Sequence, residues 1–413
     1  MTFHPPSKSF TVRDYLFIAF VALLFMLASY ALITFNLKLK GGGEFYTYLT
    51  ASRGFVLEKI DPYGAEIPAR VQPLVYGRFA RAGEKPYILD TPFHLILFYF
   101  PFVLFSDPLT ARAIYTWLLE LTLIPLAIIS LRLTDWEVPF ILSMFFAAIC
   151  IFNIYSIQAI YDASPVLMLG LFYAGILSAL RYDMDEVAGA LIAVSFYRWE
   201  VGAPFLFLVI LRVYREKRVG VLYGFLMLTF LAFVVSFLMY ANWLVPFLRA
   251  VTNNLRADFG YNLRTVLADL FPVQGNLIAW IIVIILLIAL TYEWSVARDA
   301  DFRRFYWASC LSIAVAPLLG FRTEMANLSV LVIPLALIFA VVHDRWKKIN
   351  DFLTILLMLF VFLIPWALSL IPTRSAQEIA FLFLPVFTII GLYWIRWWAL
   401  HPPRIWSDLA PHP

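Results

Sequence analysis

Long apolar segments separated by polar connections make up most of this sequence. A helix needs about 20 apolar residues to cross the hydrocarbon core of a bilayer, and several segments reach or approach that length. The segments predicted to be membrane helices are 15–35, 110–131, 138–155, 164–180, 187–196, 201–211, 219–240, 277–297, 305–319, 328–342, 352–371 and 379–395. The pattern predicts an all-α polytopic membrane protein with about twelve crossings in a single transmembrane domain, residues 1–413.

The composition agrees with a membrane location. Hydrophobic residues make up 63% of the chain and charged residues 14%, with a mean hydropathy of +0.84, whereas soluble domains have about 25% charged residues. The net charge of +4 is small for 413 residues and gives no reason to expect a nucleic-acid partner. We therefore expect membrane lipid to surround the protein, and the sequence identifies no protein partner.

Positive charges in short connections predict the topology. They cluster at Arg212–Arg218, at Arg298–Arg304 and at Arg345 with Lys347 and Lys348, and the positive-inside rule assigns such clusters to the cytoplasm. We expect a multi-pass protein of the plasma membrane with both termini cytoplasmic. The long polar stretches 36–107 and 241–276 then become outer loops, where apolar residues at helical intervals predict amphipathic helices at the membrane interface.

Two apolar regions are too short to span in the ordinary way. Residues 92–105 start at a proline and end near Asp107, and we expect a re-entrant or interfacial helix there. Residues 187–196 and 201–211 are separated by Arg198, Trp199 and Glu200. We predict a helix pair whose connection lies below the outer membrane surface and lines a water-filled cavity, where buried charge is tolerated.

A glycine run after the first helix precedes the strongest catalytic candidate. Gly41, Gly42 and Gly43 allow a sharp turn and are followed by Glu44. A carboxylate beside apolar and aromatic groups can have a raised pKa and act as a general base. The alternative is an ordinary interfacial glutamate after a flexible turn.

Further polar residues of the outer loops are candidates for substrate binding. Arg198 and Arg322 suit a lipid-linked phosphate or another polar headgroup because guanidinium groups bind phosphate oxygens well. An ion pair that fastens two helices is the alternative for Arg198. The remaining candidates, each with an ordinary structural alternative such as a turn or a helix terminus, are Asp61, Tyr63, Asp90, His94, Gln158, Asp162 and Glu324.

Motifs for several other chemistries are absent from the sequence. It has no P-loop, CxxC pair, HExxH or nucleophile elbow, which argues against ATP-driven transport, structural zinc and serine hydrolysis. No cofactor is predicted. A divalent metal ion is left open, because Asp61, Asp90 and Asp162 could converge in space.

Short motifs in order along the chain resemble the GT-C class of membrane glycosyltransferases, and within it glycosyltransferase family 87, the mannosyltransferase-like group. The resemblance covers roughly residues 15–345. Its motifs are Glu44 with Tyr48 and Asp61-Pro62-Tyr63, then Asp90-Thr91-Pro92-Phe93, Ile157-Gln158, Arg198 with Pro204, and the stretch from Ala316-Pro317 to Asn327. This chain has Glu44 where the family usually has aspartate and Arg198 where it has lysine, and it lacks the glycine before Gln158.

The resemblance implies an inverting transfer of a sugar, with mannose as one candidate, from a polyprenyl-phosphate donor to a lipid or glycan acceptor on the non-cytoplasmic face. It implies Glu44 as catalytic base, Arg198 and Arg322 at the donor phosphate, and Tyr48 among the substrate-binding residues. The competing hypothesis is a non-enzymatic protein, namely a transporter or scramblase for lipid-linked substrates or a structural subunit of a membrane complex.

Overall fold

The computed structural model describes residues 12–256, 259–346 and 349–401. Over these ranges the fold is a bundle of helices, and the β-structure consists of a single bridge between Tyr261 and Thr323. The all-α prediction is therefore confirmed. Lys347 and Lys348, which the topology prediction used, lie outside the described residues.

Helices coincide with every apolar segment predicted from the sequence. Within the described residues, eight helical stretches are long and apolar enough to cross a membrane, and a ninth is the pair α7 (Phe140–Phe152) and α8 (Ile154–Tyr161), which is bent by 46°. The eight are α1 (Val12–Lys38), α6 (Pro108–Leu133), Asp185–Glu216, α12 (Val219–Met239), α15 (Gly275–Ala297), Met325–Arg345 ending in α17 (Val332–Arg345), α18 (Asn350–Ser369) and α19 (Arg374–Leu400).

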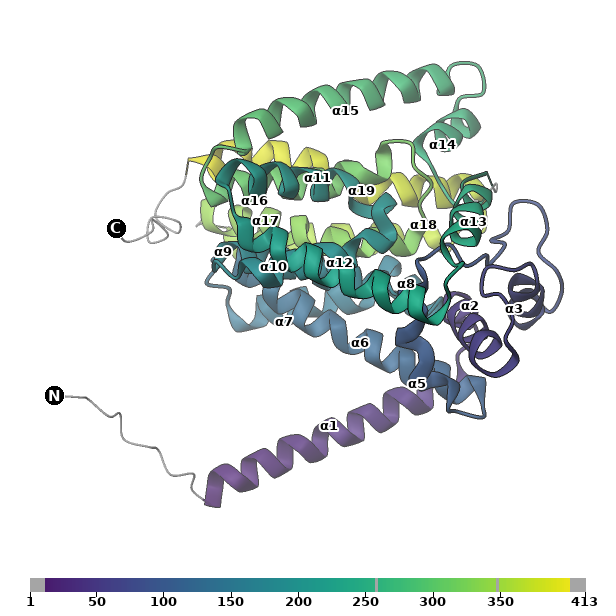
Figure 1. Cartoon of the computed structure of the whole chain (residues 1–413). Coiled ribbons are helices and arrows are strands. Elements are labelled where there is room, and N and C mark those ends of the chain that lie inside the picture. Colours follow the sequence, from purple (N-terminus) through teal and green to yellow (C-terminus); the bar gives the residue numbers. More distant parts are fainter. Residues whose placement is uncertain (1–11, 257–258, 347–348, 402–413) are drawn as a thin grey trace.

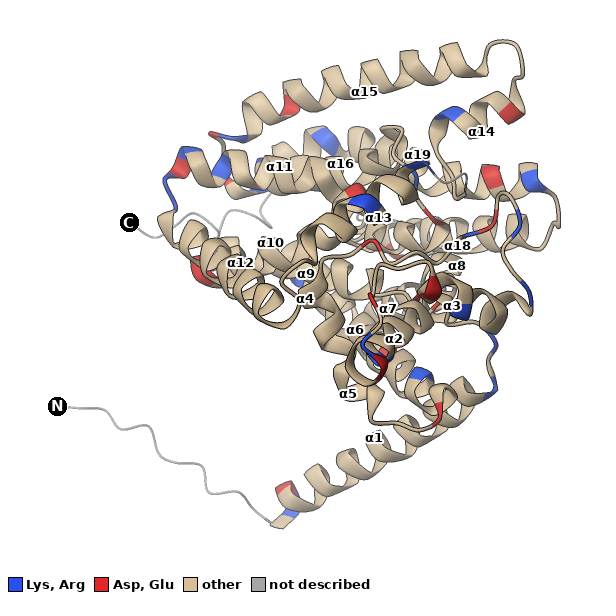
Figure 2. Ribbon diagram, turned by 45° about the vertical axis from the view of Figure 1, so that its right-hand side comes forward, with Lys and Arg blue, Asp and Glu red and all other residues tan. Residues whose placement is uncertain are grey.

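The difference from the predicted twelve has two causes: the predicted segments 187–196 and 201–211 both lie in the stretch Asp185–Glu216, and two further helices are short. Helix α9 (Val166–Arg181) has 16 residues and α16 (Phe302–Val315) has 14, fewer than the roughly 20 that a straight crossing needs. Charged residues lie mainly near helix ends and in connections (Figure 2). Much of α1, α12 and α15 is exposed apolar surface, as expected for helices that face lipid.

The stretch Asp185–Glu216 is a hairpin rather than one long helix. A straight helix of 32 residues would be about 48 Å long, yet Arg218, two residues beyond its end, binds Asp185 at its start and Asp183 at 2.9 Å. Helix α10 (Asp185–Ser195) therefore turns back through Phe196–Arg198 into α11 (Trp199–Glu216), which is kinked at Gly202. The predicted helix pair is confirmed.

The turn of this hairpin lies part-way along the bundle. Helices α10 and α12 start together and pack closely, because a Cβ at Gly189 would lie 2.0 Å from the Val221 oxygen and one at Gly224 would lie 2.1 Å from the Glu186 oxygen. The 11 residues of α10 extend about 16 Å, whereas the 21 residues of α12 extend about 31 Å. The turn residues Phe196–Arg198 add about 6 Å, so Arg198 lies about two thirds of the way along α12, short of its end.

Shorter helices cover one end of the bundle, which we call the loop end and which lies on the right in Figure 1. They are α2 (Gly43–Arg53), α3 (Glu66–Tyr76), α4 (Phe93–Ile96), α5 (Phe100–Val103), α13 (Leu244–Arg256) and α14 (Leu263–Leu270). The opposite end, the basic end, carries the first two arginine clusters, which meet where Arg215 pairs with Asp299 at 3.1 Å.

Residues 92–105 stay at the loop end, as predicted for a segment that does not cross. Helices α4 and α5 are joined by a tight turn, Leu97–Tyr99. The hydroxyl of Ser52 donates to the Ile96 oxygen at 3.2 Å, and the Phe93 ring packs on Tyr240, just past the end of α12.

The two predicted interfacial helices differ from each other. Helix α13 fits the prediction, because Val245 and Leu248 are exposed and Ala250 is buried. The prediction is wrong for α2, whose residues from Gly43 to Leu49 are all buried. Its polar residues face other protein segments, so its mixed composition reflects an internal polar site and not a membrane surface.

Helix α1 projects away from the bundle (Figure 1) and is joined to it at the loop end. The guanidinium of Arg112 donates to the backbone oxygens of Asn36, Leu39 and Gly41 at 2.6–3.0 Å. Arg112 therefore satisfies carbonyl groups at and beyond the end of α1, which a helix otherwise leaves unpaired.

The close contact of α10 with α12 can be tested with Gly189→Ala. The added methyl group would overlap backbone, so the helices must separate, and overpacking costs about 1–3 kcal/mol. We expect a lower thermal unfolding midpoint in detergent. Gly175→Ala is the control, because its methyl group would meet only the flexible end of Leu191, at 2.9 Å. Equal midpoints for both variants would contradict this packing.

Candidate functional site

A cavity of about 580 Å³ lies between α2, the hairpin turn, α13 and α15. It has two kinds of wall. The polar wall comprises Glu44, Lys85, Asp90, Arg198, Glu200, Arg322 and Glu324. The apolar wall comprises Phe247, Leu248, Val251 and Leu255 of α13 and Ala279, Trp280 and Val283 of α15. A ligand that fills it would need both a polar and an apolar part.

The glycine run positions Glu44 at the start of α2. Gly41 and Gly42 have φ of 107° and 88°, a region that favours glycine. A Cβ at Gly42 would lie 2.4 Å from Arg112, and one at Gly43 would lie 2.4 Å from the Tyr87 hydroxyl. The sharp turn predicted from the sequence is present, and it needs glycine for space as well as for conformation.

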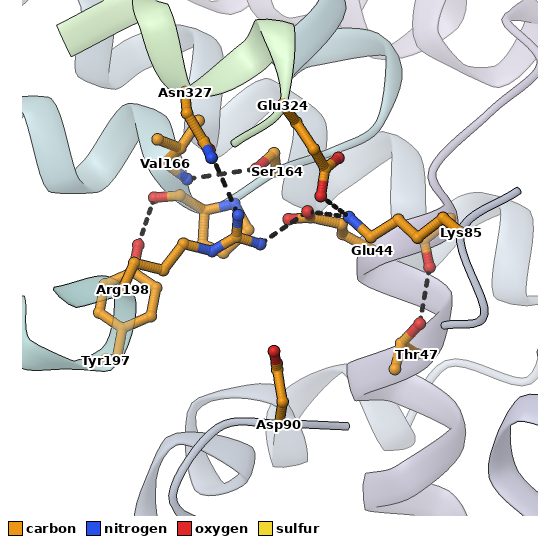
Figure 3. Close-up of polar contacts among 12 residues, drawn as sticks. Glu44, Thr47, Lys85, Asp90, Ser164, Val166, Tyr197, Arg198, Glu324 and Asn327 are labelled. Carbon is orange, nitrogen blue, oxygen red and sulfur yellow. Dashed lines mark hydrogen bonds and ion pairs between the residues drawn. The ribbon is translucent and has the colours of Figure 1, made fainter. Parts of the chain in front are cut away.

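Glu44 and two cations form the centre of the polar wall (Figure 3). One carboxylate oxygen of Glu44, Oε1, accepts from Lys85 Nζ at 2.5 Å and from Arg198 Nη2 at 2.6 Å. Lys85 also binds Glu324 at 2.6 Å, and Arg198 donates to the Asn327 oxygen at 3.3 Å. Four distant parts of the chain are thereby joined, and the helix-fastening ion pair considered for Arg198 is also real.

The charge state of Glu44 differs from the prediction. Burial raises the pKa of this carboxyl, but the charges of Arg198 and Lys85 outweigh burial and hold the pKa below its usual range. The predicted raised pKa is therefore wrong for Glu44 in this structure, because the sequence did not show that Arg198 and Lys85 lie beside it. Burial lowers the pKa of Lys85, yet Glu324 and Glu44 raise it above its ordinary value.

Two aspartates near this cluster have raised pKa values because they are buried. Asp90 lines the cavity and accepts a hydrogen bond from the Asn254 side chain. Asp162 lies outside the cavity lining, but its backbone oxygen accepts from Glu44 N at 3.2 Å. Burial raises the pKa of Asp162 to about 7, with Lys85 opposing and Glu324 adding to the shift.

The structure brings some sequence candidates together and leaves others apart. Glu44, Tyr48, Asp90, Arg198, Arg322 and Glu324 line the cavity. The guanidinium of Arg322 also lies 5.9 Å from the Phe259 ring centre. Asp61, Tyr63, His94, Gln158 and Asp162 do not belong to the lining.

The remaining candidates lie in turns and helices outside the cavity. Asp61 closes a turn by accepting from Tyr63 N at 2.9 Å, and the Tyr63 hydroxyl donates to the Thr91 oxygen at 2.9 Å. His94 is a residue of α4, and burial lowers its pKa to about 4. Gln158 lies on α8. Asp61 therefore has the turn role considered for it.

Lys85 is the most important of the cavity residues that sequence reasoning missed, because it pairs with Glu44. It lies in a polar loop, 41 positions from Glu44 and 239 positions from Glu324, and no local motif marks it. The one sequence feature that could have pointed to Lys85 is its position shortly before Tyr87 and Pro92, which also line the cavity.

The three aspartates considered as metal ligands are not grouped around a common point. Within residues 12–256, 259–346 and 349–401, no three His, Cys, Asp or Glu side chains are grouped so that they could hold a metal ion. Asp61, Asp90 and Asp162 thus do not form the convergent set that the sequence left open.

Comparison with known proteins gives one structural similarity. No protein-family model matches the chain, and no curated protein matches it. The chain is similar to the crystal structure of ArnT from Cupriavidus metallidurans bound to undecaprenyl phosphate, with a TM-score of 0.46 and 14% sequence identity. The match covers 94% of this chain and 73% of that chain. The resemblance to family 87 stays a prediction from sequence motifs.

The raised pKa of Asp162 predicts a pH-dependent stability. The unfolded side chain loses its proton near pH 3.8 and the folded one near pH 7, so between these values the folded state binds more protons. Its stability must fall as pH rises through this window. We expect Asp162→Asn to remove part of this decrease in stability. The variant should therefore have a thermal unfolding midpoint at pH 8 that is higher than that of the wild type by about a few degrees.

Thermal unfolding of both proteins in detergent at pH 4, 6 and 8 measures this effect. Near pH 4 the two midpoints should be similar, because Asp162 then keeps its proton in the folded state. The same pH slope in wild type and variant would show that Asp162 does not titrate in this way.

Proposed function

We propose that this protein is a membrane glycosyltransferase of the GT-C class, which transfers a sugar from a polyprenyl-phosphate donor to an acceptor hydroxyl. The observation that carries the proposal is the pairing, in one cavity, of half-buried cations with an apolar wall on α13 and α15. A polyprenyl-phosphate sugar has the same division, because a charged headgroup is joined to a hydrocarbon chain.

The donor phosphate would bind at the cations of the polar wall. Lys85 and Arg198 meet at one point through Glu44, and Arg322 lines the same cavity. Guanidinium and ammonium groups make charge-assisted hydrogen bonds to phosphate oxygens. Because the hairpin turn ends short of the loop end of α12, the phosphate would sit below the end of the bundle, and the hydrocarbon chain of the lipid would extend along α13 and α15.

Glu44 is the proposed general base. It takes the proton of the acceptor hydroxyl, whose oxygen forms a bond to the anomeric carbon of the sugar. The bond between that carbon and the phosphate oxygen breaks, and its electron pair leaves with the polyprenyl phosphate. Arg198, Lys85 and Arg322 stabilise the charge on this leaving group. Attack from the side opposite the phosphate inverts the configuration of the anomeric carbon.

The membrane face on which the cavity opens and the identity of the sugar are the parts of the proposal that rest on the sequence. By the positive-inside rule, the basic end faces the cytoplasm, so the cavity and the loop end face the non-cytoplasmic side of the plasma membrane. The family 87 motifs make mannose one candidate sugar, and the acceptor is a lipid or a glycan.

The proposal predicts that Glu44→Gln lowers transfer at least about 100-fold, because general base catalysis contributes about 10²–10⁴-fold. The assay incubates the reconstituted protein with polyprenyl-phosphate sugars and candidate acceptors, and measures the release of free polyprenyl phosphate. Glu66→Gln, the same change on exposed α3, should keep the wild-type rate.

The same assay separates enzyme from non-enzyme. A transporter, a scramblase or a structural subunit would release no free polyprenyl phosphate. Release at the wild-type rate by Glu44→Gln would remove Glu44 from the mechanism and leave the class of activity standing.

A further inference from the structure

In the structure, Glu44 engages the two cations to which the proposed function assigns the donor phosphate. Its side chain is 4% exposed, and Oε1 is shared by Lys85 and Arg198. The second oxygen, Oε2, is buried and has no hydrogen-bond partner among the described residues. One oxygen of the carboxylate is thus held by cations, and the other is available to a hydroxyl donor.

The charges around this point already cancel. Glu44 and Glu324 oppose Lys85 and Arg198 in one network. A buried phosphate adds at least one negative charge. In a low-dielectric cavity, such a surplus is costly unless an acid leaves its cations or gains a proton.

We infer, building on the proposed function, that Glu44 is an internal competitor of the donor phosphate, and that phosphate binding to Lys85 and Arg198 displaces Glu44 and converts it into an effective base. Glu44 is the acid chosen because it alone, among the described acids of the lining, forms ion pairs with both cations.

Displacement changes what Glu44 can do chemically. While Glu44 is paired with the two cations, they hold its pKa low, so it is a weak base. Once phosphate oxygens take the N–H groups of Lys85 and Arg198, burial is opposed by less positive charge and the carboxylate gains affinity for a proton. The acceptor hydroxyl supplies that proton. Deprotonation of the acceptor is thereby coupled to the presence of the donor.

Binding of a polyprenyl phosphate to purified protein tests the inference without requiring turnover. If Glu44 competes with phosphate, Glu44→Gln should bind the lipid about tenfold more tightly than wild type. Glu44→Asp, which keeps the charge but draws it back from both cations, should bind with intermediate affinity. Glu66→Gln, with the same loss of charge on exposed α3, should bind like wild type.

The outcomes separate this inference from the proposed function. Unchanged or weaker binding by folded Glu44→Gln would overturn the competition while leaving a polyprenyl-phosphate site in place. Should Glu44→Gln fail to fold, as judged by thermal unfolding, Glu44→Asp decides: tighter binding supports competition and unchanged or weaker binding overturns it. Absence of binding by wild type would overturn both proposals.

Discussion

The ion cluster around Glu44 is the interaction on which the site depends. A carboxylate that is 4% exposed must be paired with cations to stay charged, and Glu44 meets this need with Lys85 and Arg198. These cations come from a loop and from the hairpin turn, and Glu324 and Asn327 complete the set. The charge pairing therefore joins α2, this loop, the hairpin turn and the segment that contains Glu324 and Asn327 along one wall of the cavity.

The short helix α10 places the ion cluster below the end of the bundle. Helix α10 is about half as long as its neighbour α12, and their glycine contacts hold the two side by side. The turn that follows brings Arg198 below the end of the bundle. The glycines before Glu44 act from the other side, because side chains at Gly42 or Gly43 would collide with Arg112 or Tyr87. Local sequence features thus position both ends of the Glu44–Arg198 pair.

The lining of the cavity links this charge cluster to lipid chemistry. Apolar residues of α13 and α15 form a wall beside the acids and bases, and α15 is largely exposed over the rest of its surface. Such a site suits a ligand with a charged head and a hydrocarbon chain. In the ion cluster Glu44 and Glu324 balance Lys85 and Arg198, so a charged head that binds these cations would have to displace or protonate one of the two acids.

The sequence by itself determined the helical fold, because hydrophobic length and helical periodicity are local properties. It also determined the hairpin at Arg198, since its two segments are each too short to span, and the glycine turn before Glu44. Only the tertiary structure decided that Lys85 joins Glu44, that α2 is buried, and that Asp61, His94 and Gln158 lie outside the cavity. It also decided the charge state of Glu44. These outcomes depend on contacts between segments up to 239 positions apart, and the pKa of a buried carboxyl follows from the cations that such contacts bring to it, which no local pattern specifies.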